Sequence, residues 1–310
     1  MKEVYTLADL ESRDLLDAGA ENKPARLAVI GHPIAHSASP RMHQAALDDR
    51  GENMRYIRID VEPGKVGEAF ARMMKLGFIG CNVTVPHKLE AMEHCEVDHH
   101  ATMLGAVNTI HFDGNRTIGY NTDGPGFESA IEQDFKLSLS SMKVAVVGAG
   151  GGAGQAIATQ CVVSGARKLV MVNRTIEKID RLRDHLEDKQ LESLFSKIWK
   201  DREIIALSFD DPALREHCLS CDLIVNTSSV GLKPGDPSIL PADCLKPEHL
   251  VYDTIYQPPV TPLLAAAIET GCRASNGLSM LVHQGALAFQ HWFPGSVPLP
   301  VMRAALGKTA

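Results

Sequence analysis

The sequence predicts an α/β protein with two domains, the second built on a doubly wound parallel sheet. Its length of 310 residues is roughly twice the usual domain length of about 150 residues, so two cores can be buried. Short apolar segments alternate with longer segments of helical periodicity along most of the chain. This alternation is the pattern of β/α units.

The first alternation follows residues 1–23, an acidic leader that we interpret as a short amphipathic helix. Near its end, Asp113, Gly114 and Asn115 favour a hairpin turn between the predicted strands 105–112 and 117–121. Apolar and alternating segments predict, in order, strand 27–30, helix 40–50, strand 56–61, helix 63–76, strand 78–83, strand 105–112 and strand 117–121.

A second and more regular alternation begins near Met142, and its six short strands predict the doubly wound sheet. We expect the helices that follow it, at 280–292 and 300–306, to pack on the first domain. One domain would then comprise residues 1–122 and 278–310, and the other residues 123–277. The six predicted strands are 143–147, 169–173, 204–208, 222–226, 250–255 and 273–275.

Composition and charge exclude several classes of protein. Hydrophobic residues make up 45% and charged residues 22% of the chain, as in ordinary globular proteins. The net charge of −7 gives no footprint for nucleic acid or an anionic membrane, so we expect a small-molecule partner. No apolar segment approaches the ~20 residues of a membrane span, and the N-terminus lacks the apolar stretch of a signal peptide. We therefore expect a cytoplasmic protein.

The seven cysteines are odd in number and scattered, which favours reduced thiols over a disulfide framework. Cys218 and Cys221 form one C-x2-C pair, but a zinc ribbon needs a second pair. His94, Cys95 and residues 98–100 bring metal-ligand types together without a metal-binding spacing, and a polar helix face explains them as well. We expect no metal site.

A glycine-rich loop follows strand 143–147 directly and leads into a helical segment, 155–164. Glycines permit a tight turn and close backbone approach to a pyrophosphate, and a helix N-terminus offers unpaired N–H groups. A flexible turn is the alternative, but strand, loop, helix and next strand follow in the expected order. The loop therefore predicts dinucleotide binding through Gly148, Ala149, Gly150, Gly151, Gly152 and Ala153.

The end of the second strand of this domain predicts which dinucleotide binds. An NAD enzyme would place an acidic residue there for the ribose 2′-hydroxyl, whereas this chain has Asn173, Arg174 and Thr175. Arg174 suits a 2′-phosphate, with Thr175 and Lys178 near enough to help. We therefore expect NADP, although Arg174 as a solvated surface charge is the alternative.

Eight further segments, taken together, resemble the shikimate dehydrogenase family. They occur in the family's order, within a match from about residue 27 to residue 293 that leaves the leader uncovered. The segments are 31–40 (GHPIAHSASP), 82–88 (NVTVPHK), 105–109 (GAVNT), 121–124 (NTDG), 173–175 (NRT), 226–228 (NTS), Tyr256 with 261–263 (TPL), and 277–286 (GLSMLVHQGA).

The resemblance implies that Lys88 and Asp123 are the catalytic pair. Reduction of a ketone needs a proton for the developing alkoxide, and a cation beside that oxygen also stabilises its charge. Lys88 would supply both, while Asp123 would orient the substrate and the ammonium group. A surface ion pair is the alternative for any single lysine or aspartate, but both residues lie in loops or strand ends within matching motifs.

The resemblance also implies the remaining site residues. Ser37, Ser39 and Tyr256 would bind the substrate carboxylate, although Ser39 before Pro40 could instead be a helix N-cap. The hydroxyl-binding site would be completed by Thr84, Asn108, Asp123 and Gln284. Thr254 and Gly277 would line the nicotinamide end of the cofactor site.

The implied activity is the reversible NADPH-dependent reduction of 3-dehydroshikimate to shikimate, by a monomer or homodimer. Quinate/shikimate dehydrogenase and a relative acting on an amino analogue are neighbouring alternatives. Ser37 and Ser39 favour shikimate as the substrate. A non-catalytic NADP-binding sensor is the alternative from another class, and the presence of both Lys88 and Asp123 argues against it.

Overall fold

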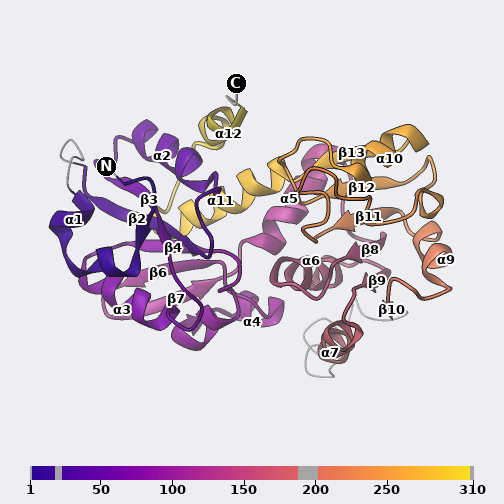
Figure 1. Cartoon of the computed structure of the whole chain (residues 1–310), viewed down its shortest axis with the longest axis horizontal. Helices are drawn as coiled ribbons and strands as arrows, with labels where there is room; N and C mark the ends of the chain where they lie inside the picture. Colours follow the sequence, from indigo (N-terminus) through magenta and orange to yellow (C-terminus); the bar gives the residue numbers. More distant parts are fainter. Residues whose placement is uncertain (1, 18–22, 188–201, 308–310) are drawn as a thin grey trace. The chain divides into compact units, whose positions relative to one another are not determined.

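The computed structural model describes residues 2–17, 23–187 and 202–307, which form two compact units (Figure 1). Unit 1 comprises Met1–Thr122 and Leu281–Ala310, and unit 2 comprises Asp123–Met280. Each unit is an α/β structure with its own sheet, as the alternating segments predict.

Unit 1 is built on a seven-stranded sheet in which β6 alone runs antiparallel to its neighbours, among the described residues. In sheet order the strands are β1 (Tyr5–Thr6), β3 (Arg55–Asp60), β2 (Ala25–Gly31), β4 (Gly80–Val83), β6 (Thr109–Asp113), β7 (Arg116–Tyr120) and β5 (Glu96–Val97). The helices are η1 (Leu7–Glu11), α1 (Arg13–Asp17), α2 (Ser39–Asp49), α3 (Val66–Lys75), η2 (Glu90–His94), α4 (His99–Leu104), α11 (Leu278–Trp292), whose first residues belong to unit 2, and α12 (Leu299–Gly307).

An aromatic cluster joins helix α11 to the sheet of unit 1. The Trp292 indole N–H donates to the carbonyl of Ile110 at 2.8 Å. His43 stacks on Tyr56 with ring centroids 4.5 Å apart, and the Trp292 ring lies 5.4 Å from His43. Burial lowers the pKa of His43 to about 3, so this ring is neutral in the core.

The prediction of a single helix for the leader is wrong. Tyr5 and Thr6 form β1, which pairs in parallel with Ile59 and Asp60 of β3. A turn then starts η1, because the Asp9 carboxylate accepts from the Thr6 amide at 2.9 Å and from its hydroxyl at 3.1 Å. Pairing with a distant strand and this local cap replace the first turns of the expected helix.

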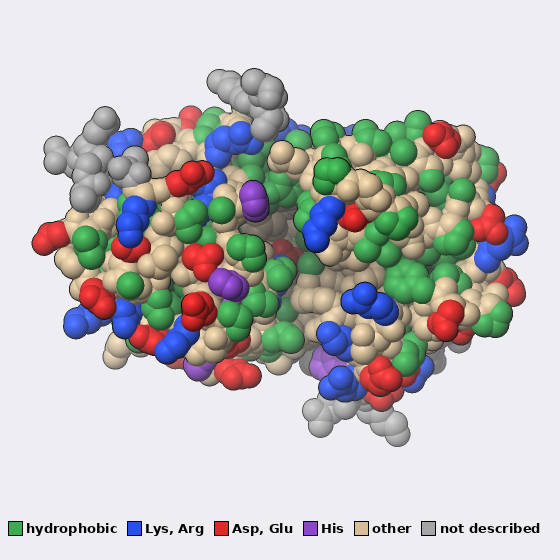
Figure 2. Space-filling view, viewed as in Figure 1, with side chains coloured by type: hydrophobic (Ala, Val, Ile, Leu, Met, Phe, Trp, Pro, Cys, Tyr) green, Lys and Arg blue, Asp and Glu red, His purple; other side chains and the backbone are tan. Residues whose placement is uncertain are grey.

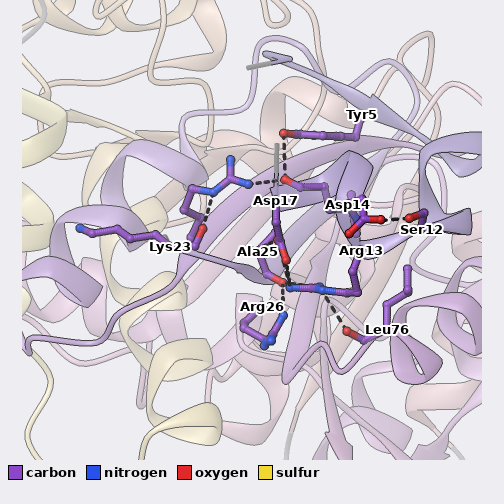
Figure 3. A network of polar contacts seen from close by, with 11 residues as sticks. Tyr5, Ser12, Arg13, Asp14, Asp17, Lys23, Ala25, Arg26 and Leu76 are labelled. Atoms are coloured by element: carbon purple, nitrogen blue, oxygen red, sulfur yellow. Dashed lines mark hydrogen bonds and ion pairs between the residues drawn. The ribbon is translucent and has the colours of Figure 1, made fainter. Parts of the chain in front are cut away.

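Polar contacts tie the rest of the leader to the sheet and to α3 (Figure 3). Arg13 donates to the carbonyls of Ala25 at 2.8 Å and Leu76 at 3.1 Å. Asp17 pairs with Arg13 and accepts from the Ala25 amide at 3.0 Å. Leu16 is completely buried in the same core as β2 and β3. Residues 5–17 of the leader are therefore an integral part of unit 1.

We expect Leu16→Ala to destabilise the protein by about 2 to 5 kcal/mol, because it leaves a cavity in the core of unit 1. Leu15→Ala is the matched control, since Leu15 is 54% exposed and surface changes cost less than about 0.5 kcal/mol. Urea unfolding of both variants measures the difference. Equal midpoints for the two variants would show that the leader contributes nothing to the core.

Unit 2 contains a fully parallel six-stranded sheet whose strand order is that of a Rossmann fold. The six strands predicted from the sequence are confirmed, with ends displaced by at most two residues. They are, in sheet order, β10 (Glu203–Leu207), β9 (Lys168–Val172), β8 (Lys143–Val147), β11 (Leu223–Asn226), β12 (Leu250–Asp253) and β13 (Arg273–Asn276). The helices are α5 (Asp123–Phe135), α6 (Gly152–Val163), α7 (Ile176–Leu186), α9 (Leu214–Leu219), η3 (Ala242–Cys244) and α10 (Pro262–Thr270).

Alternation within β8 shows why this sheet is covered on both faces. Val144 and Val146 pack in a core with residues of α5, α6 and α7. Ala145 and Val147 point the other way, into a core with residues of α9 and α10. Because both faces are buried, the central strands β8, β9 and β11 are mostly apolar, which makes them easy to predict.

The surface carries charged side chains of both signs, as the numbers of basic and acidic residues in the sequence lead one to expect. On the face shown in Figure 2, Lys and Arg side chains are interspersed with Asp and Glu side chains. Within the described ranges, no helix has the length and apolar character that a bilayer crossing requires.

Candidate functional site

The glycine-rich loop of unit 2 forms a cradle at the N-terminus of α6. Gly148 adopts a positive φ of 86° and its amide donates to the Val172 carbonyl at 2.7 Å, so the loop turns tightly at the end of β8. Gly151 is the N-cap of α6 and provides no side-chain cap. Helix α6 therefore begins without a side-chain cap, and a helix N-terminus of this kind suits a pyrophosphate group.

Close packing explains two further glycines of this loop. A Cβ on Gly154 would lie 2.5 Å from the Gly148 carbonyl oxygen and 2.8 Å from the Ala149 Cα, so only glycine lets the helix approach the loop. A Cβ on Gly150 would lie 2.6 Å from the side-chain nitrogen Nδ2 of Asn173. Gly154 is not among the residues that the sequence predicts for the dinucleotide site.

The end of β9 presents the predicted cationic residues beside this cradle. Asn173 bridges the strand end, since its amide donates to the Leu207 carbonyl at 3.1 Å and its side chain donates to the Thr175 carbonyl at 2.9 Å. Thr175 is the N-cap of α7 and makes no side-chain cap. Arg174 and Lys178 are exposed. These groups fit the 2′-phosphate that the sequence predicts.

Thr254, Tyr256 and Gly277 lie at the same edge of this sheet, beyond β12 and β13. The Gly277 amide donates to the Ile255 carbonyl at 3.1 Å. A Cβ on Gly277 would lie 2.0 Å from the Thr254 carbonyl oxygen, so this backbone approach requires glycine. The structure thereby brings together Thr254 and Gly277, which the sequence assigned to one end of the cofactor site.

In unit 1, Ser37 lies on the segment after β2, and Thr84 and Lys88 lie on the segment after β4. The Thr84 amide donates to the Ile30 carbonyl at 2.9 Å, and the His32 amide donates to the Val85 carbonyl at 3.1 Å, so the two loops are joined. The Lys88 carbonyl accepts from the Val107 amide at 3.0 Å. The turn that carries Lys88 is therefore fixed on both sides.

His87, beside Lys88, anchors this turn in the core. Its ring is completely buried, and Nε2 lies 2.6 Å from the Val61 carbonyl oxygen, so Nε2 carries the proton and donates. Its Nδ1 lies 3.7 Å from the Glu90 carboxylate. Glu90 in turn accepts from the amides of Gly64 at 3.0 Å and Val66 at 2.9 Å, at the start of α3.

Asn108 lies in a buried polar network that fixes the orientation of its amide. Oδ1 accepts from the Thr122 amide at 2.8 Å and from the Thr109 hydroxyl at 3.0 Å, while Nδ2 donates to the Thr122 hydroxyl at 3.0 Å. A backbone N–H can only donate, so Oδ1 must face Thr122. The orientation of the Asn108 amide is thus fixed, and Thr122 precedes Asp123 in the chain.

Asn82 and Tyr56 extend this network into the core. Tyr56 donates from its hydroxyl to Asn82 Oδ1 at 2.6 Å, and Asn82 Nδ2 donates to the Thr109 hydroxyl at 3.1 Å. Burial raises the pKa of Tyr56, so its hydroxyl keeps its proton. Asn82 is the first residue of the segment 82–88, but nothing in the sequence connects it or Tyr56 with Asn108.

Ser37 and Ser39 lie at the start of α2, and the interpretation of Ser39 as the N-cap is wrong. The N-cap is Ala38 and Ser39 is the first helical residue. Ser37 acts at this end instead, because its hydroxyl accepts from the Ser39 amide at 3.3 Å. Arg58, which the sequence did not indicate, donates twice to the Ser37 carbonyl, at 3.0 and 2.7 Å. The hydroxyl of Ser39 is thus not engaged as a cap.

Two predicted residues begin or line helices. Gln284 lies in α11, and its side chain donates to the Leu281 carbonyl at 2.8 Å. Asp123 is the first residue of α5 and belongs to unit 2. Unit 1 therefore contains Ser37, Ser39, Thr84, Lys88, Asn108 and Gln284, and unit 2 contains Asp123, Tyr256 and the predicted cofactor residues.

A Rossmann sheet with a glycine cradle, next to exposed cations at the end of its second strand, defines an α/β dinucleotide-binding protein with a further α/β unit. Three family models match this chain. Residues 29–110 match the shikimate dehydrogenase substrate binding domain, residues 129–210 match shikimate / quinate 5-dehydrogenase, and residues 277–306 match the shikimate 5'-dehydrogenase C-terminal domain.

Individual relatives agree with the family models. The chain is 41% identical to a shikimate dehydrogenase (NADP(+)) from Geobacillus kaustophilus over 266 residues, which cover 85% of this chain and 91% of that protein. A crystal structure of a shikimate dehydrogenase in complex with NADP+ matches with a TM-score of 0.81 and 34% identity, and the match covers 93% of this chain and 96% of that chain. A quinate dehydrogenase from Corynebacterium glutamicum in complex with NAD matches with a TM-score of 0.80 and 28% identity, and the match covers 92% of this chain and 99% of that chain. The chain belongs to the shikimate dehydrogenase family.

We expect Gly154→Ala and Gly151→Ser to separate the structural role of the glycine cradle from its ligand-binding role. Gly154→Ala should destabilise the protein by about 1 to 3 kcal/mol, because the added methyl forces α6 away from the loop. Gly151→Ser should keep the stability, since a Cβ there meets only the Gly148 carbonyl oxygen at 3.8 Å and serine is a favourable N-cap. Its hydroxyl would engage the amides of α6 and weaken binding of NADPH.

Thermal unfolding and a fluorescence titration with NADPH measure the two effects. Wild-type NADPH affinity in Gly151→Ser would show that the first amides of α6 do not contact the dinucleotide.

Proposed function

We propose that the protein is an NADP-dependent shikimate dehydrogenase that reversibly reduces 3-dehydroshikimate to shikimate, a step in the biosynthesis of aromatic amino acids through chorismate. The main support is that unit 1 carries Lys88 on a turn next to the loop of Thr84, which is joined to the loop before Ser37 and Ser39, and that it holds the Asn108 amide in a fixed orientation. These polar side chains suit a small acid with several hydroxyl groups. Unit 1 would bind the substrate and unit 2 the cofactor.

NADP fits the groups at the dinucleotide site. The glycine cradle and the first amides of α6 would hold the pyrophosphate, and Asn173, Arg174, Thr175 and Lys178 would hold the 2′-phosphate. Thr254 and Gly277 would line the nicotinamide end. When bound, NADPH supplies the hydride for the reduction. The protein supplies the orientation and the proton.

Lys88 would provide that proton. Its ammonium group would donate to the ketone oxygen as negative charge develops there, and its own charge would stabilise the oxygen until the proton has moved. Asp123 would accept a hydrogen bond from the substrate and orient it. The hydroxyls of Ser37, Ser39 and Tyr256 would donate to the carboxylate, while Thr84, Asn108 and Gln284 would bind the ring hydroxyls.

Quinate/shikimate dehydrogenase is the second candidate, because the matching solved structures include a quinate dehydrogenase. Quinate carries an additional hydroxyl on a saturated carbon, which redirects its carboxylate. In the proposed function, two serines and Tyr256 would offer three donors to the planar carboxylate of shikimate, and each buried donor left unpaired costs about 1 to 3 kcal/mol.

We expect kcat/KM for shikimate to exceed that for quinate by at least about tenfold, one such mismatch. The measurement is the absorbance at 340 nm with each acid and with NADP or NAD in turn. Comparable efficiencies on both acids would place the protein with the quinate/shikimate enzymes. Binding of NADP without turnover of any of these acids would overturn the enzymatic assignment and favour a sensor.

We expect Lys88→Ala to lower kcat for shikimate oxidation by about 10²- to 10⁴-fold while KM changes much less, because the other contacts still bind the ground state. Lys75→Ala is the matched control, since Lys75 is an exposed lysine of unit 1 and should keep wild-type kinetics. A near-normal kcat for Lys88→Ala would exclude Lys88 as the proton donor.

A further inference from the structure

The last residues of four neighbouring strands in unit 2 form one row across the sheet. In the parallel register Asn226 of β11 pairs with Val147 of β8 on one side and with Asp253 of β12 on the other. Asp253 pairs in turn with Asn276 of β13. Three polar side chains therefore stand side by side at the edge where the sheet meets its loops.

Asp253 is the centre of this row. It is completely buried, and burial raises the pKa of its carboxyl. The carboxylate accepts from the Thr261 hydroxyl at 2.6 Å, from the Ile255 amide at 3.0 Å, and from Asn226 Nδ2 at 3.1 Å to each oxygen. The three donors belong to different segments of the chain, so the carboxylate joins the end of β11 to both ends of the loop 254–261.

The loop 254–261 is held at several points by these strand ends. Besides the two bonds to Asp253, the Thr254 amide donates to the Asn226 carbonyl at 2.9 Å, and Asn276 Nδ2 donates to the Pro259 carbonyl at 2.9 Å. Thr261 also accepts from the Leu264 amide at 3.3 Å, which caps α10. Tyr256 lies within this fixed loop.

Asn226 also makes hydrogen bonds to the loop that follows β11. Its Oδ1 accepts from the Ser228 amide at 2.9 Å and from the Ser228 hydroxyl at 2.8 Å. A Cβ on Gly148 would lie 2.8 Å from the Ser228 amide nitrogen, so this loop touches the glycine cradle.

We propose that Asp253 is a positioning residue for the substrate: it fixes the loop 254–261 so that the Tyr256 hydroxyl is held ready for the substrate carboxylate. This inference rests on the proposed function. Asp253 acts through Tyr256, since its carboxylate is engaged by donors of the protein. Without this carboxylate the loop would lose the hydrogen-bond acceptor that the Ile255 amide and the Thr261 hydroxyl share, and its conformation would be less well defined.

A double-mutant cycle tests this role. Asp253→Asn keeps the size of the side chain but places an N–H against groups that themselves donate, so at least one buried donor is left unpaired. We expect kcat/KM for shikimate to fall about tenfold or more, mainly through KM. Tyr256→Phe alone should cost about tenfold, and in the Asp253→Asn background it should cost less than about twofold, because the hydroxyl is already misplaced.

The controls separate positioning from general damage. Arg174→Ala should combine additively with Asp253→Asn, because Arg174 acts at the other end of the cofactor site. Affinity for 2′,5′-ADP should be unchanged in Asp253→Asn, since this probe occupies only the adenosine end. Additive losses for Asp253→Asn and Tyr256→Phe, or equal losses of shikimate and 2′,5′-ADP binding, would overturn the inference.

A second pair of variants covers the case in which Asp253→Asn fails to fold. Thr261→Val removes the donor at 2.6 Å and leaves the carboxylate paired with Asn226 and Ile255, whereas Thr261→Ser retains the hydroxyl. Thr261→Val should raise KM for shikimate severalfold and Thr261→Ser should restore it. Equal values for the two variants would contradict the inference. A wild-type protein inactive on shikimate would instead overturn the proposed function.

Discussion

The parallel register of the sheet in unit 2 is the constraint on which its chemistry depends. Parallel strands end at a common edge, so Val147, Asn226, Asp253 and Asn276, which span about 130 positions of the sequence, form one row there. The turn at Gly148, the amides of α6 and the loop beyond Asp253 all follow from that edge. Unit 1 applies the same principle, because the loops after the parallel strands β2 and β4 meet through His32 and Val85.

Much of the fold was predictable because both faces of the strands in unit 2 are buried. Segments such as 144–147 are apolar throughout, and among the glycines that follow, Gly148 and Gly154 hold positions whose geometry permits no larger residue. The leader was not predictable in this way. Its strand contains two residues, Tyr5 and Thr6, and exists only because β3 supplies the hydrogen-bonding partners.

The candidate site was predictable at the level of motifs but not of contacts. The chain order places Lys88, Asn108 and Arg174 in recognisable segments, and the structure shows what surrounds them. The orientation of the Asn108 amide depends on the backbone N–H of Thr122, and the turn at Ser37 is held by a hydrogen bond from Arg58. Such partners are distant in sequence and ordinary in type, so no local pattern marks them.

The two-residue strand β1 has a consequence for how the protein behaves among other molecules. It occupies the outer side of β3 at Ile59 and Asp60, a position that would otherwise offer unpaired backbone N–H and C=O groups to any extended chain nearby. A protein shortened by this strand would expose a sheet edge together with the apolar surface beneath Tyr5. Because unpaired strand edges pair with other chains, association between copies would then compete with folding.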